Sequence, residues 1–437
     1  MSIPSTVVVV GSSVAGVRAA QALRTEGFPG RLIMVGEEPD LPYDKPPLSK
    51  QFLAGSADVA RVSLLTAETA EASGIELRLG AAADRLDIST KQLHLADGTV
   101  LDWDAVVLAT GSAARPSPWT TESGVHVVRT MGDARALRDE LQNDQPVVVV
   151  GGGFIGAEVA ATAHALGRQV TVVDPLHAPI GRLVGSEVGE FFTELHHRHG
   201  VTTVFGVGVE SVSGRAGDLT VTLTDGRELR AGTVVVGIGA TPNDEWLATS
   251  GLLVENGVIC DEYCRAVNTA DVYAVGDLAR CFRPTSKEHL RVEHWTNAVD
   301  SAAIAAHNIV CPDDLRSHQA VEYVWSDQYD WKIQIVGRPA LATAHAVVGT
   351  LTGDTARGAA VYSDESGRLQ GAVTVNWPKA LMTCRRLMAA DGTFEDARTE
   401  LDALLSAARQ KLGSAPQVVQ PASREATRYA VGSGDPV

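Results

Sequence analysis

Residues Val147–Glu158 read VVVVGGGFIGAE, and this stretch decides the fold. Four valines run directly into Gly151, Gly153 and Gly156, and a helical pattern follows through Leu166. This order predicts a buried parallel strand, a tight turn and the N-terminus of a helix. Glycines in such a turn let the backbone approach a pyrophosphate, and the helix dipole favours its negative charge. The stretch therefore predicts a dinucleotide site.

The strand that follows the helix indicates which dinucleotide is bound. Gln169–Val173 is a run of strand formers that ends in Asp174. A carboxylate at this strand end accepts hydrogen bonds from an adenosine ribose and repels a 2′-phosphate, which favours NAD over NADP. Glycine turns also pack helices on strands without any ligand. The order of strand, turn, helix, strand and terminal acid favours the ligand.

The chain contains the same arrangement a second time. Val7–Gly16, VVVVGSSVAG, predicts a strand and turn, with a helix through Leu23 and a second strand Arg31–Val35 before an acidic pair that begins at Glu37. Two such folds imply two dinucleotides. Ser13 stands where the second glycine is expected, so the backbone must accommodate a Cβ near the phosphates.

The length and charge of the chain indicate how many domains it has and which partners it does not bind. A chain of 437 residues is too long to fold around a single hydrophobic core, and this length predicts two or three domains. The formal charge of −16 argues against nucleic acid or an anionic membrane as the main partner, since both would repel the chain. We find neither an apolar run long enough to span a membrane nor a basic segment typical of a signal peptide, so we expect a cytoplasmic protein.

The five cysteines indicate ordinary thiols. Cys260 and Cys264 are four residues apart, while Cys281, Cys311 and Cys384 are scattered. The sequence offers no second pair or histidine cluster to complete a zinc or iron–sulfur site, so no metal is predicted. An odd number of cysteines suits a reducing compartment.

The loop after the first nucleotide fold carries a candidate catalytic lysine. Asp40–Lys50, DLPYDKPPLSK, predicts an extended loop because of its prolines, with a helix start near Ser49. Lys50 could face a flavin ring, or it could be a solvated lysine.

Small residues at a later strand end extend the first candidate site. Ala109, Thr110 and Gly111 follow a buried strand, where a backbone can lie close to a cofactor. The strand–turn–strand pattern that precedes them, with its turn at Asp97, recurs before Gly239, with Asp225 at the turn. The duplication thus covers whole domains.

The last third of the chain predicts a different architecture. Residues 258–280 predict a strand that enters a helix at Asp277, a residue that could bind ribityl hydroxyls or serve only as the helix N-cap. From residue 323 the pattern changes to antiparallel strands with helices at 379–391 and 395–411, typical of a separate α+β domain. The tail 412–437 is predicted to be disordered.

Eight motifs together resemble one family. In chain order these are GSSVAG, LPYDKPPLSK, ATG, GGGFIGAE, GIGATPN, VYAVGD, VEHWTNA and WSDQYDWKIQIVG. Their combination resembles the FAD-dependent, NADH-oxidising ferredoxin reductases that serve Rieske-type oxygenases and bacterial haem-thiolate monooxygenases, over residues 5–411. The resemblance implies an α/β chain with two Rossmann-like dinucleotide-binding domains and a C-terminal α+β interface domain. The implied boundaries are 1–112 and 246–322 for FAD, 113–245 for NAD and 323–411 for the interface domain.

The resemblance also implies roles for matching residues. Lys50, Glu158 and Trp325 become the predicted catalytic residues, with Lys50 beside the isoalloxazine, Glu158 near the nicotinamide and paired with Lys50, and Trp295 and Trp325 bordering the flavin. The implied FAD contacts are Gly11, Ser13, Ala15, Gly16, Glu37, Lys50, Ala109, Thr110, Gly111, Arg129, Asp277 and Trp295. The implied NADH contacts are Gly151, Gly153, Ile155, Gly156, Glu158, Asp174, Arg182 and Gly239.

One absence guides the predicted activity. Disulfide reductases of the fold carry a cysteine pair after the first nucleotide fold, and residues 38–60 contain no cysteine. The flavin is then expected to take hydride from NADH and pass single electrons to a 2Fe–2S ferredoxin that feeds an oxygenase. Docking is expected on a basic cluster at Lys379, Arg385 and Arg386, on a monomer or homodimer.

Two other functions stay open. One is a related reductase that uses rubredoxin, a nitrite-reductase module or oxygen. The other is a non-catalytic redox sensor resembling apoptosis-inducing factors.

Overall fold

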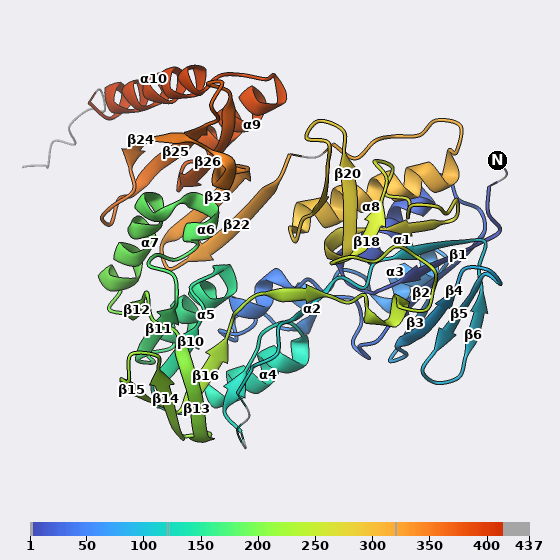
Figure 1. The fold of residues 1–437 in the computed structure, drawn as a ribbon, viewed down its shortest axis with the longest axis horizontal. Helices are drawn as coiled ribbons and strands as arrows, with labels where there is room; N and C mark the ends of the chain where they lie inside the picture. The colour runs from blue at the N-terminus through green and yellow to red at the C-terminus, as the bar shows by residue number, and fades with distance from the viewer. Residues whose placement is uncertain (1–2, 120, 122, 320, 414–437) are drawn as a thin grey trace, which may run out of the picture.

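The computed structural model describes residues 3–119, 121, 123–319 and 321–413, and its ribbon divides into three parts (Figure 1). The first quarter of the chain and the residues from about 245 to 319 form one part, the segment between them forms another, and the chain from residue 323 forms the third. This architecture confirms the predicted α/β class with an α+β C-terminal part. The predicted disordered tail lies outside the described residues, except for residues 412 and 413, which end the last helix.

A five-stranded parallel sheet organises the first part. Its order is β19-β7-β1-β2-β3, so the strands come from two distant segments of the chain. Helices α1 and α8 pack against each other on this sheet (Figure 1). Valines of the central strand are fully buried, as expected for a parallel sheet covered on both faces. The elements are β1 (Thr6–Val10), β2 (Arg31–Gly36), β3 (Ile75–Leu79), β7 (Ala105–Leu108), β19 (Val272–Ala274), α1 (Val14–Thr25) and α8 (Trp295–Val310).

The second part repeats that sheet with the same topology. Its order is β9-β16-β10-β11-β12, so each strand stands at the position of its counterpart in the first sheet. The duplication inferred from the sequence is thereby confirmed at the level of strand order. The elements are β9 (Val125–His126), β10 (Val147–Val150), β11 (Val170–Asp174), β12 (Thr202–Phe205), β16 (Thr233–Val236), α4 (Met131–Glu140), α5 (Phe154–Ala165), α6 (Gly181–Val184) and α7 (Ser186–Arg198).

Smaller sheets complete the two nucleotide folds. Each fold carries a three-stranded antiparallel sheet, β4-β5-β6 or β13-β14-β15, and a ribbon of β8 with β17 joins the two parts. The first part also holds a sheet of β18, β20 and β21. The bounds are β4 (Ala83–Asp87), β5 (Gln92–Leu95), β6 (Val100–Asp102), β8 (Ser112–Ala114), β13 (Val209–Arg215), β14 (Asp218–Leu223), β15 (Glu228–Ala231), β17 (Ala240–Pro242), β18 (Val258–Cys260), β20 (Ala279–Arg283) and β21 (Glu288–Arg291).

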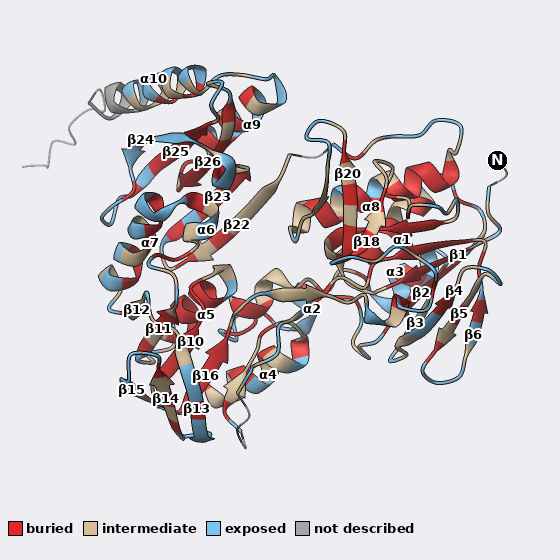
Figure 2. Ribbon diagram, in the orientation of Figure 1, coloured by how far each residue is buried: buried red, intermediate tan, exposed pale blue. Residues whose placement is uncertain are grey.

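The C-terminal part is an antiparallel sheet covered by two helices. The strand order is β22-β23-β26-β25-β24, and most residues of β23, β25 and β26 are buried (Figure 2). This confirms the predicted change of architecture and both predicted helices. The elements are β22 (Tyr323–Gln328), β23 (Trp331–Gly337), β24 (Ala344–Thr350), β25 (Arg357–Ser363), β26 (Leu369–Val375), α9 (Pro378–Ala389) and α10 (Phe394–Gly413).

Two local predictions were wrong. No helix starts near Ser49, because a four-residue 3₁₀ helix, η1 (Pro46–Ser49), ends there and turns follow, before the short α2 (Val59–Val62) and α3 (Ala67–Ala72). The chain also forms only the three-residue η3 (Gly276–Leu278) at Asp277 and then enters a strand. The remaining 3₁₀ helices are η2 (Glu245–Leu247) and η4 (Pro339–Leu341). Among the described residues, no helix has the length and apolar character that crossing a membrane requires.

A buried histidine makes the contact between α7 and the C-terminal part sensitive to pH. His196 has no exposed surface, and its Nδ1 lies 2.8 Å from the Tyr329 hydroxyl. Burial, and then the neighbouring His197 and His199, lower the pKa of His196 from 6.5 to about 4. The unfolded chain therefore binds this proton more readily. We expect up to about 3 kcal/mol of stability to be lost as the pH falls from 6.5 to 4.

The measurement for this prediction is the pH dependence of the unfolding free energy in wild type and in a His196→Leu variant. Subtracting the two curves removes the contribution of the carboxylates. The wild-type curve should fall more steeply between pH 6.5 and 4, and parallel curves over that interval would contradict the prediction.

Candidate functional site

A cavity of about 910 Å³ opens at the carboxyl ends of the first parallel sheet. This is the edge at which open α/β sheets bind their ligands. The cavity volume lies within the range of cofactor and ligand pockets. Of the predicted FAD contacts, those that line it are Gly11, Ser13, Ala15, Glu37, Ala109, Thr110, Gly111, Arg129 and Asp277. Gly16, Lys50 and Trp295 lie outside this lining. Gly16 belongs to the glycine turn, and Lys50 and Trp295 belong to the region described below.

Glycines shape the turn between β1 and α1. A Cβ on Gly11, whose φ is +116°, would lie 2.2 Å from the Ala109 carbonyl oxygen, and a Cβ on Gly16 would lie 1.8 Å from the Gly11 carbonyl oxygen. Only glycine fits at either position. The free N–H groups of the first turn of α1 therefore face the cavity at close range, which suits a pyrophosphate.

Ser13 is tolerated because the turn leaves room at its position. Its counterpart in the second copy is Gly153, where an added Cβ would meet no atom within 4 Å. The predicted departure from the glycine pattern therefore places no strain on the turn. Ser13 lines the cavity and is the N-cap residue of α1.

An ionic cluster closes one side of the cavity. Arg129 donates from Nε to the Ser112 carbonyl oxygen at 2.7 Å and from a terminal nitrogen to Asp277 at 3.0 Å. The Ser112 hydroxyl donates to the same Asp277 oxygen at 2.8 Å. The structure thus joins two predicted FAD contacts, Arg129 and Asp277, through Ser112. Sequence reasoning missed Ser112 because a serine on a strand gives no motif of its own.

The proline-rich loop supplies further cavity residues that the sequence analysis did not identify. Tyr43 and Lys45 line the cavity and both contact Glu38, with Lys45 Nζ at 3.1 Å from its carboxylate. Burial lowers the pKa of Lys45, and burial together with the Glu38 hydrogen bond raises the pKa of Tyr43. Both residues lie within the LPYDKPPLSK motif, so that motif was the available signal.

The predicted ion pair between Lys50 and Glu158 is present. Lys50 Nζ lies 2.6 Å from Glu158 Oε2, and the two side chains are only 12% and 3% exposed. The Glu158 carboxylate also accepts hydrogen bonds from the hydroxyls of Ser49, at 2.5 Å, and Ser326, at 2.8 Å. Glu158 lies on α5, Ser49 and Lys50 follow the first nucleotide fold, and Ser326 lies on β22. One buried carboxylate therefore joins all three parts of the chain.

Three aromatic rings lie in a row at β22, the strand that supplies Ser326. Trp325, which precedes Ser326 in the chain, lies with its ring centroid 6.0 Å from that of Trp295 and 6.1 Å from that of Tyr323. The Trp295 indole donates to Asp44 at 2.9 Å, and burial raises the pKa of Asp44. Of the predicted catalytic residues, Lys50 and Glu158 are in direct contact, and a place for Trp325 beside them stays a prediction.

The second glycine turn has the geometry of the first. A Cβ on Gly151, whose φ is +111°, would lie 2.3 Å from the Gly237 carbonyl oxygen, and a Cβ on Gly156 would lie 2.0 Å from the Gly151 oxygen. Gly153 faces open space, and Ile155 in the first turn of α5 is 43% exposed. An exposed isoleucine beside such a turn offers an apolar contact for a nucleotide.

Asp174 stands at the end of β11, as the sequence predicts. Its carboxylate accepts hydrogen bonds from the backbone N–H of Gly152, at 2.6 Å, and Leu176, at 2.8 Å. These bonds orient the carboxylate and leave each oxygen a further lone pair. Gly239 has a φ of +109°, and a Cβ added to it would meet no atom within 4 Å.

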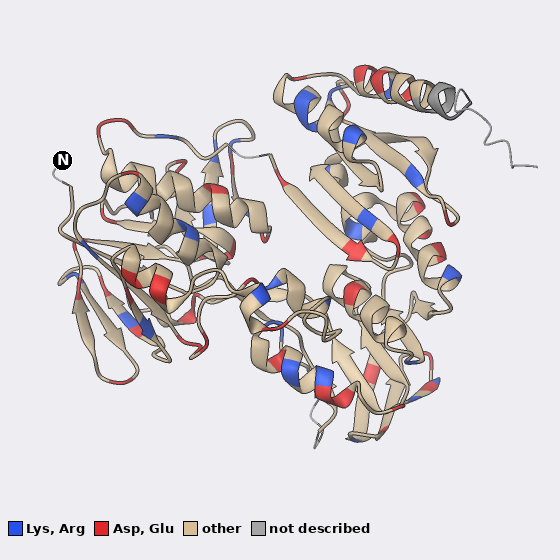
Figure 3. Ribbon diagram, turned by 180° about the vertical axis from the view of Figure 1, so that it is seen from behind, with Lys and Arg blue, Asp and Glu red and all other residues tan. Residues whose placement is uncertain are grey.

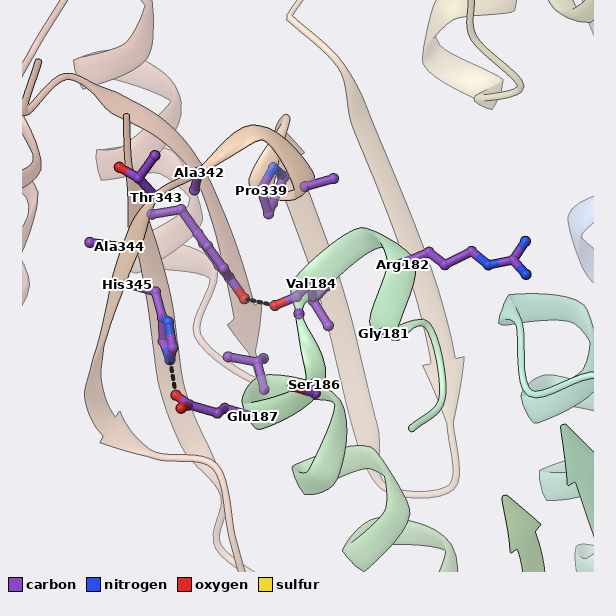
Figure 4. A pocket seen from close by; sticks show the side chains of 14 residues that line it. Gly181, Arg182, Val184, Ser186, Glu187, Pro339, Ala342, Thr343, Ala344 and His345 are labelled. Carbon is purple, nitrogen blue, oxygen red and sulfur yellow. Dashed lines mark hydrogen bonds and ion pairs between the residues drawn. The ribbon is translucent and has the colours of Figure 1, made fainter. Parts of the chain in front are cut away.

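Arg182 lies at the seam between α6 and the C-terminal part. A cavity of about 280 Å³ there is bounded by an ion pair of His345 with Glu187 and by the Tyr362 hydroxyl bonded to the Val184 carbonyl oxygen (Figure 4). The Arg182 side chain is exposed and points away from the other side chains of that cavity. Its contact with the NAD adenosine stays a prediction.

The cysteines depart from the sequence argument. All five are free, but Cys264 and Cys281 lie beside His318, a residue far away in the sequence. The sequence shows no histidine cluster beside the cysteines, and the fold brings one histidine, His318, next to two of them. Spacing along the chain gave no signal, because the fold alone brings His318 to this place.

Two family models match the chain. The pyridine nucleotide-disulphide oxidoreductase model matches residues 5–302, and the reductase C-terminal model matches residues 323–404. The chain belongs to the pyridine nucleotide-disulphide oxidoreductase family. Within this family the cavity and the two glycine turns are the expected nucleotide sites.

Similar proteins of this family have the same overall length. Rhodocoxin reductase of Rhodococcus erythropolis is 35% identical over 93% of this chain and 95% of its own length. The ferredoxin–NAD(+) reductase component of the anthranilate 1,2-dioxygenase system of Burkholderia cepacia is 38% identical over 90% of this chain and 96% of its own length. The covalent putidaredoxin reductase–putidaredoxin complex contains a chain that matches with a TM-score of 0.84 and 31% identity, over 92% of this chain and 99% of that one.

Proposed function

We propose that this chain oxidises NADH with FAD and passes single electrons to a 2Fe–2S ferredoxin that feeds an oxygenase. The names of the similar proteins support the reaction, and the row of aromatic rings Trp295, Trp325 and Tyr323, which ends beside the exposed Arg385, carries the proposal. Residues 38–60 hold no cysteine pair, so the redox disulfide found in other reductases of this fold is absent from that segment.

The residues present fit FAD. The glycine turn at Gly11 lets the N-terminus of α1 meet a pyrophosphate, and Glu37 at the end of β2 suits an adenosine ribose. Asp277 and Arg129 would hold the ribityl and phosphate groups. Bound FAD supplies the step from two-electron hydride chemistry to one-electron transfer.

The chain's own residues position and shield that chemistry. The Lys50 ammonium group places a positive charge at the junction of the two nucleotide folds, and its ion pair with Glu158 fixes its position. The hydroxyls of Ser49 and Ser326 donate to Glu158 and orient its carboxylate. Trp295 and Trp325 would border the flavin and shield it from water. Asp174 would select NADH by repelling a 2′-phosphate. Dependence on NADH favours the cytoplasm as the compartment, as the sequence analysis expects.

The exposed end of the aromatic row suggests where ferredoxin docks. The Arg385 guanidinium lies over the Tyr323 ring, 5.2 Å from its centroid, and Tyr323 stacks on Trp325. Lys379, Arg385 and the 63% exposed Met382 lie on α9, where Figure 3 shows basic residues near the acidic start of α10. A cationic, partly apolar surface suits an acidic partner.

Charge reversal on α9 tests this docking surface. We expect Arg385→Glu to lower NADH-driven ferredoxin reduction about tenfold at low salt, because the substitution repels an acidic partner and removes the cation at the end of the aromatic row. Arg386→Glu, at the third residue of the predicted basic cluster, should lower turnover less, since Arg386 already pairs with Glu400. The measurement is ferredoxin turnover as a function of ionic strength.

Reduction of ferricyanide by NADH separates docking from the chemistry of the flavin. Arg385→Glu should leave ferricyanide turnover unchanged. Unchanged ferredoxin turnover and salt dependence in Arg385→Glu would contradict the docking surface. Failure of wild type to reduce any 2Fe–2S ferredoxin, with oxygen or rubredoxin reduced instead, would contradict the proposed acceptor.

A further inference from the structure

Two thiols and one imidazole meet inside the first part of the fold, with a third thiol, Cys260, on a strand that pairs with that of Cys281. Cys260 lies on β18, Cys264 in the following turn, Cys281 on β20, and His318 in the segment that connects α8 to β22. Their exposed fractions are 0%, 0%, 3% and 2%. The cluster belongs to neither nucleotide site and has no part in the electron transfer proposed above.

The spacing of these groups is that of metal ligands. The Cys264 and Cys281 sulfurs lie 3.9 Å apart, and both lie within 4.8 Å of a ring nitrogen of His318. Two thiolates on a tetrahedral zinc ion, each about 2.3 Å from it, stand about 3.8 Å apart. A disulfide would bring the sulfurs to about 2.0 Å. The observed separation excludes a disulfide and is that of two thiols in hydrogen-bond contact, a distance that two zinc-bound thiolates also have.

His318 provides an independent observation. Neither of its ring nitrogens has a hydrogen-bond partner in the described structure, although the residue is buried. Its backbone makes two hydrogen bonds. The N–H donates to the backbone carbonyl oxygen of Glu262 at 2.7 Å, and the carbonyl oxygen accepts from the Arg283 guanidinium at 2.7 Å. An unpartnered buried imidazole is costly, and a metal ion would satisfy one of its nitrogens.

The surroundings can hold negative charge. Arg283 is 6% exposed, contacts the loop of His318 and has an Nε without a partner. The Cys281 and Cys264 sulfurs lie 3.9 Å apart. Thiolates formed here would therefore have a buried cation, Arg283, in the same region of the fold.

We propose that Cys264, Cys281 and His318 form a structural zinc site. Zn²⁺ prefers thiolate and imidazole ligands in tetrahedral arrangement, and its binding here would release two thiol protons. Cys260, which interacts with Cys281 from the neighbouring strand, is the nearest candidate for the fourth ligand. The ion would bind the segment around His318, which leads to the C-terminal part, to the two cysteines of the first nucleotide fold.

The test measures zinc in the full-length, FAD-loaded chain purified under reducing conditions from a zinc-supplemented culture. We expect about one zinc ion per chain by elemental analysis. Cys281→Ser and His318→Ala should each lose most of the zinc. Cys384→Ser, which removes another fully buried thiol far from the cluster, should keep it. Flavin content and circular dichroism report whether each variant folds.

A second measurement covers variants that fail to fold. Wild type stripped of metal and loaded with Co²⁺ should show thiolate-to-cobalt charge-transfer absorption, and its melting temperature should rise with added Zn²⁺. The proposal is overturned if reduced wild type binds no zinc or cobalt, or if Cys384→Ser loses as much zinc as Cys281→Ser. An intact mass that is lower by two hydrogens, with Cys264 and Cys281 joined as a disulfide, would also overturn it.

Discussion

Lys50→Met is expected to lower the free energy of unfolding by about 3–5 kcal/mol and to slow flavin reduction by NADH at least tenfold. The substitution leaves the Glu158 carboxylate, which is 3% exposed, without its cation at 2.6 Å. Two serine hydroxyls still donate to that carboxylate but do not neutralise it. The substitution also removes the positive charge beside the proposed flavin edge. Denaturant unfolding at saturating FAD and stopped-flow reduction measure the two effects.

A matched pair elsewhere in the chain isolates the role of burial. Lys91 lies 2.7 Å from Asp271, but both side chains are more than 40% exposed. We therefore expect Lys91→Met to cost no more than about 1 kcal/mol and to leave flavin reduction unchanged. Adding Glu158→Gln to Lys50→Met should recover much of the lost stability without restoring the reduction rate. Equal losses of stability in the two single Lys→Met variants would contradict the argument.

The recovery expected for the double variant follows from the cost of an unpaired buried charge. Removing one partner of such a pair is more damaging than removing both. Reduction should stay slow because the cation is still missing. Stability and rate therefore separate in the double variant, which a merely structural role for Lys50 does not predict.

The duplicated folds were predictable because their pattern is local. Consecutive buried valines, a glycine turn and a helix lie within single stretches such as Val147–Glu158, so local geometry determines them. The pairing of Lys50 with Glu158 spans more than a hundred residues and was anticipated only through the family resemblance. Ser326, which also donates to Glu158, comes from the C-terminal part and was not anticipated.

The missed features arise where tertiary contacts override local signals. The prolines before Ser49 predict a loop followed by a helix, yet the loop folds tightly because Tyr43 and Lys45 turn back onto Glu38. The cluster around His318 is a stronger case. Its ligands come from separate segments, and only the completed fold brings them together.

Gly156→Ala is expected to disrupt the second nucleotide fold, lowering the unfolding free energy by about 2–3 kcal/mol and abolishing reduction by NADH. Its Cβ would lie 2.0 Å from the Gly151 carbonyl oxygen, which belongs to the backbone and cannot rotate away. Helix α5 would have to move off β10, and Glu158 on the same helix would leave Lys50. Bound FAD should be retained, because its site lies on the first fold.

Gly153→Ala is the matched control in the same turn. Its Cβ meets no atom within 4 Å, so the melting temperature should stay at the wild-type value. The new methyl group instead occupies the space in front of the turn, where we place the pyrophosphate, and should raise the KM for NADH about tenfold, or about 1.4 kcal/mol. Thermal melting and ferricyanide turnover over a range of NADH concentrations distinguish the two variants. If Gly153→Ala melted like Gly156→Ala, the backbone contact at Gly156 would not explain the loss of stability. A wild-type KM would mean that this turn, like the one at Ser13, accommodates a Cβ beside the pyrophosphate.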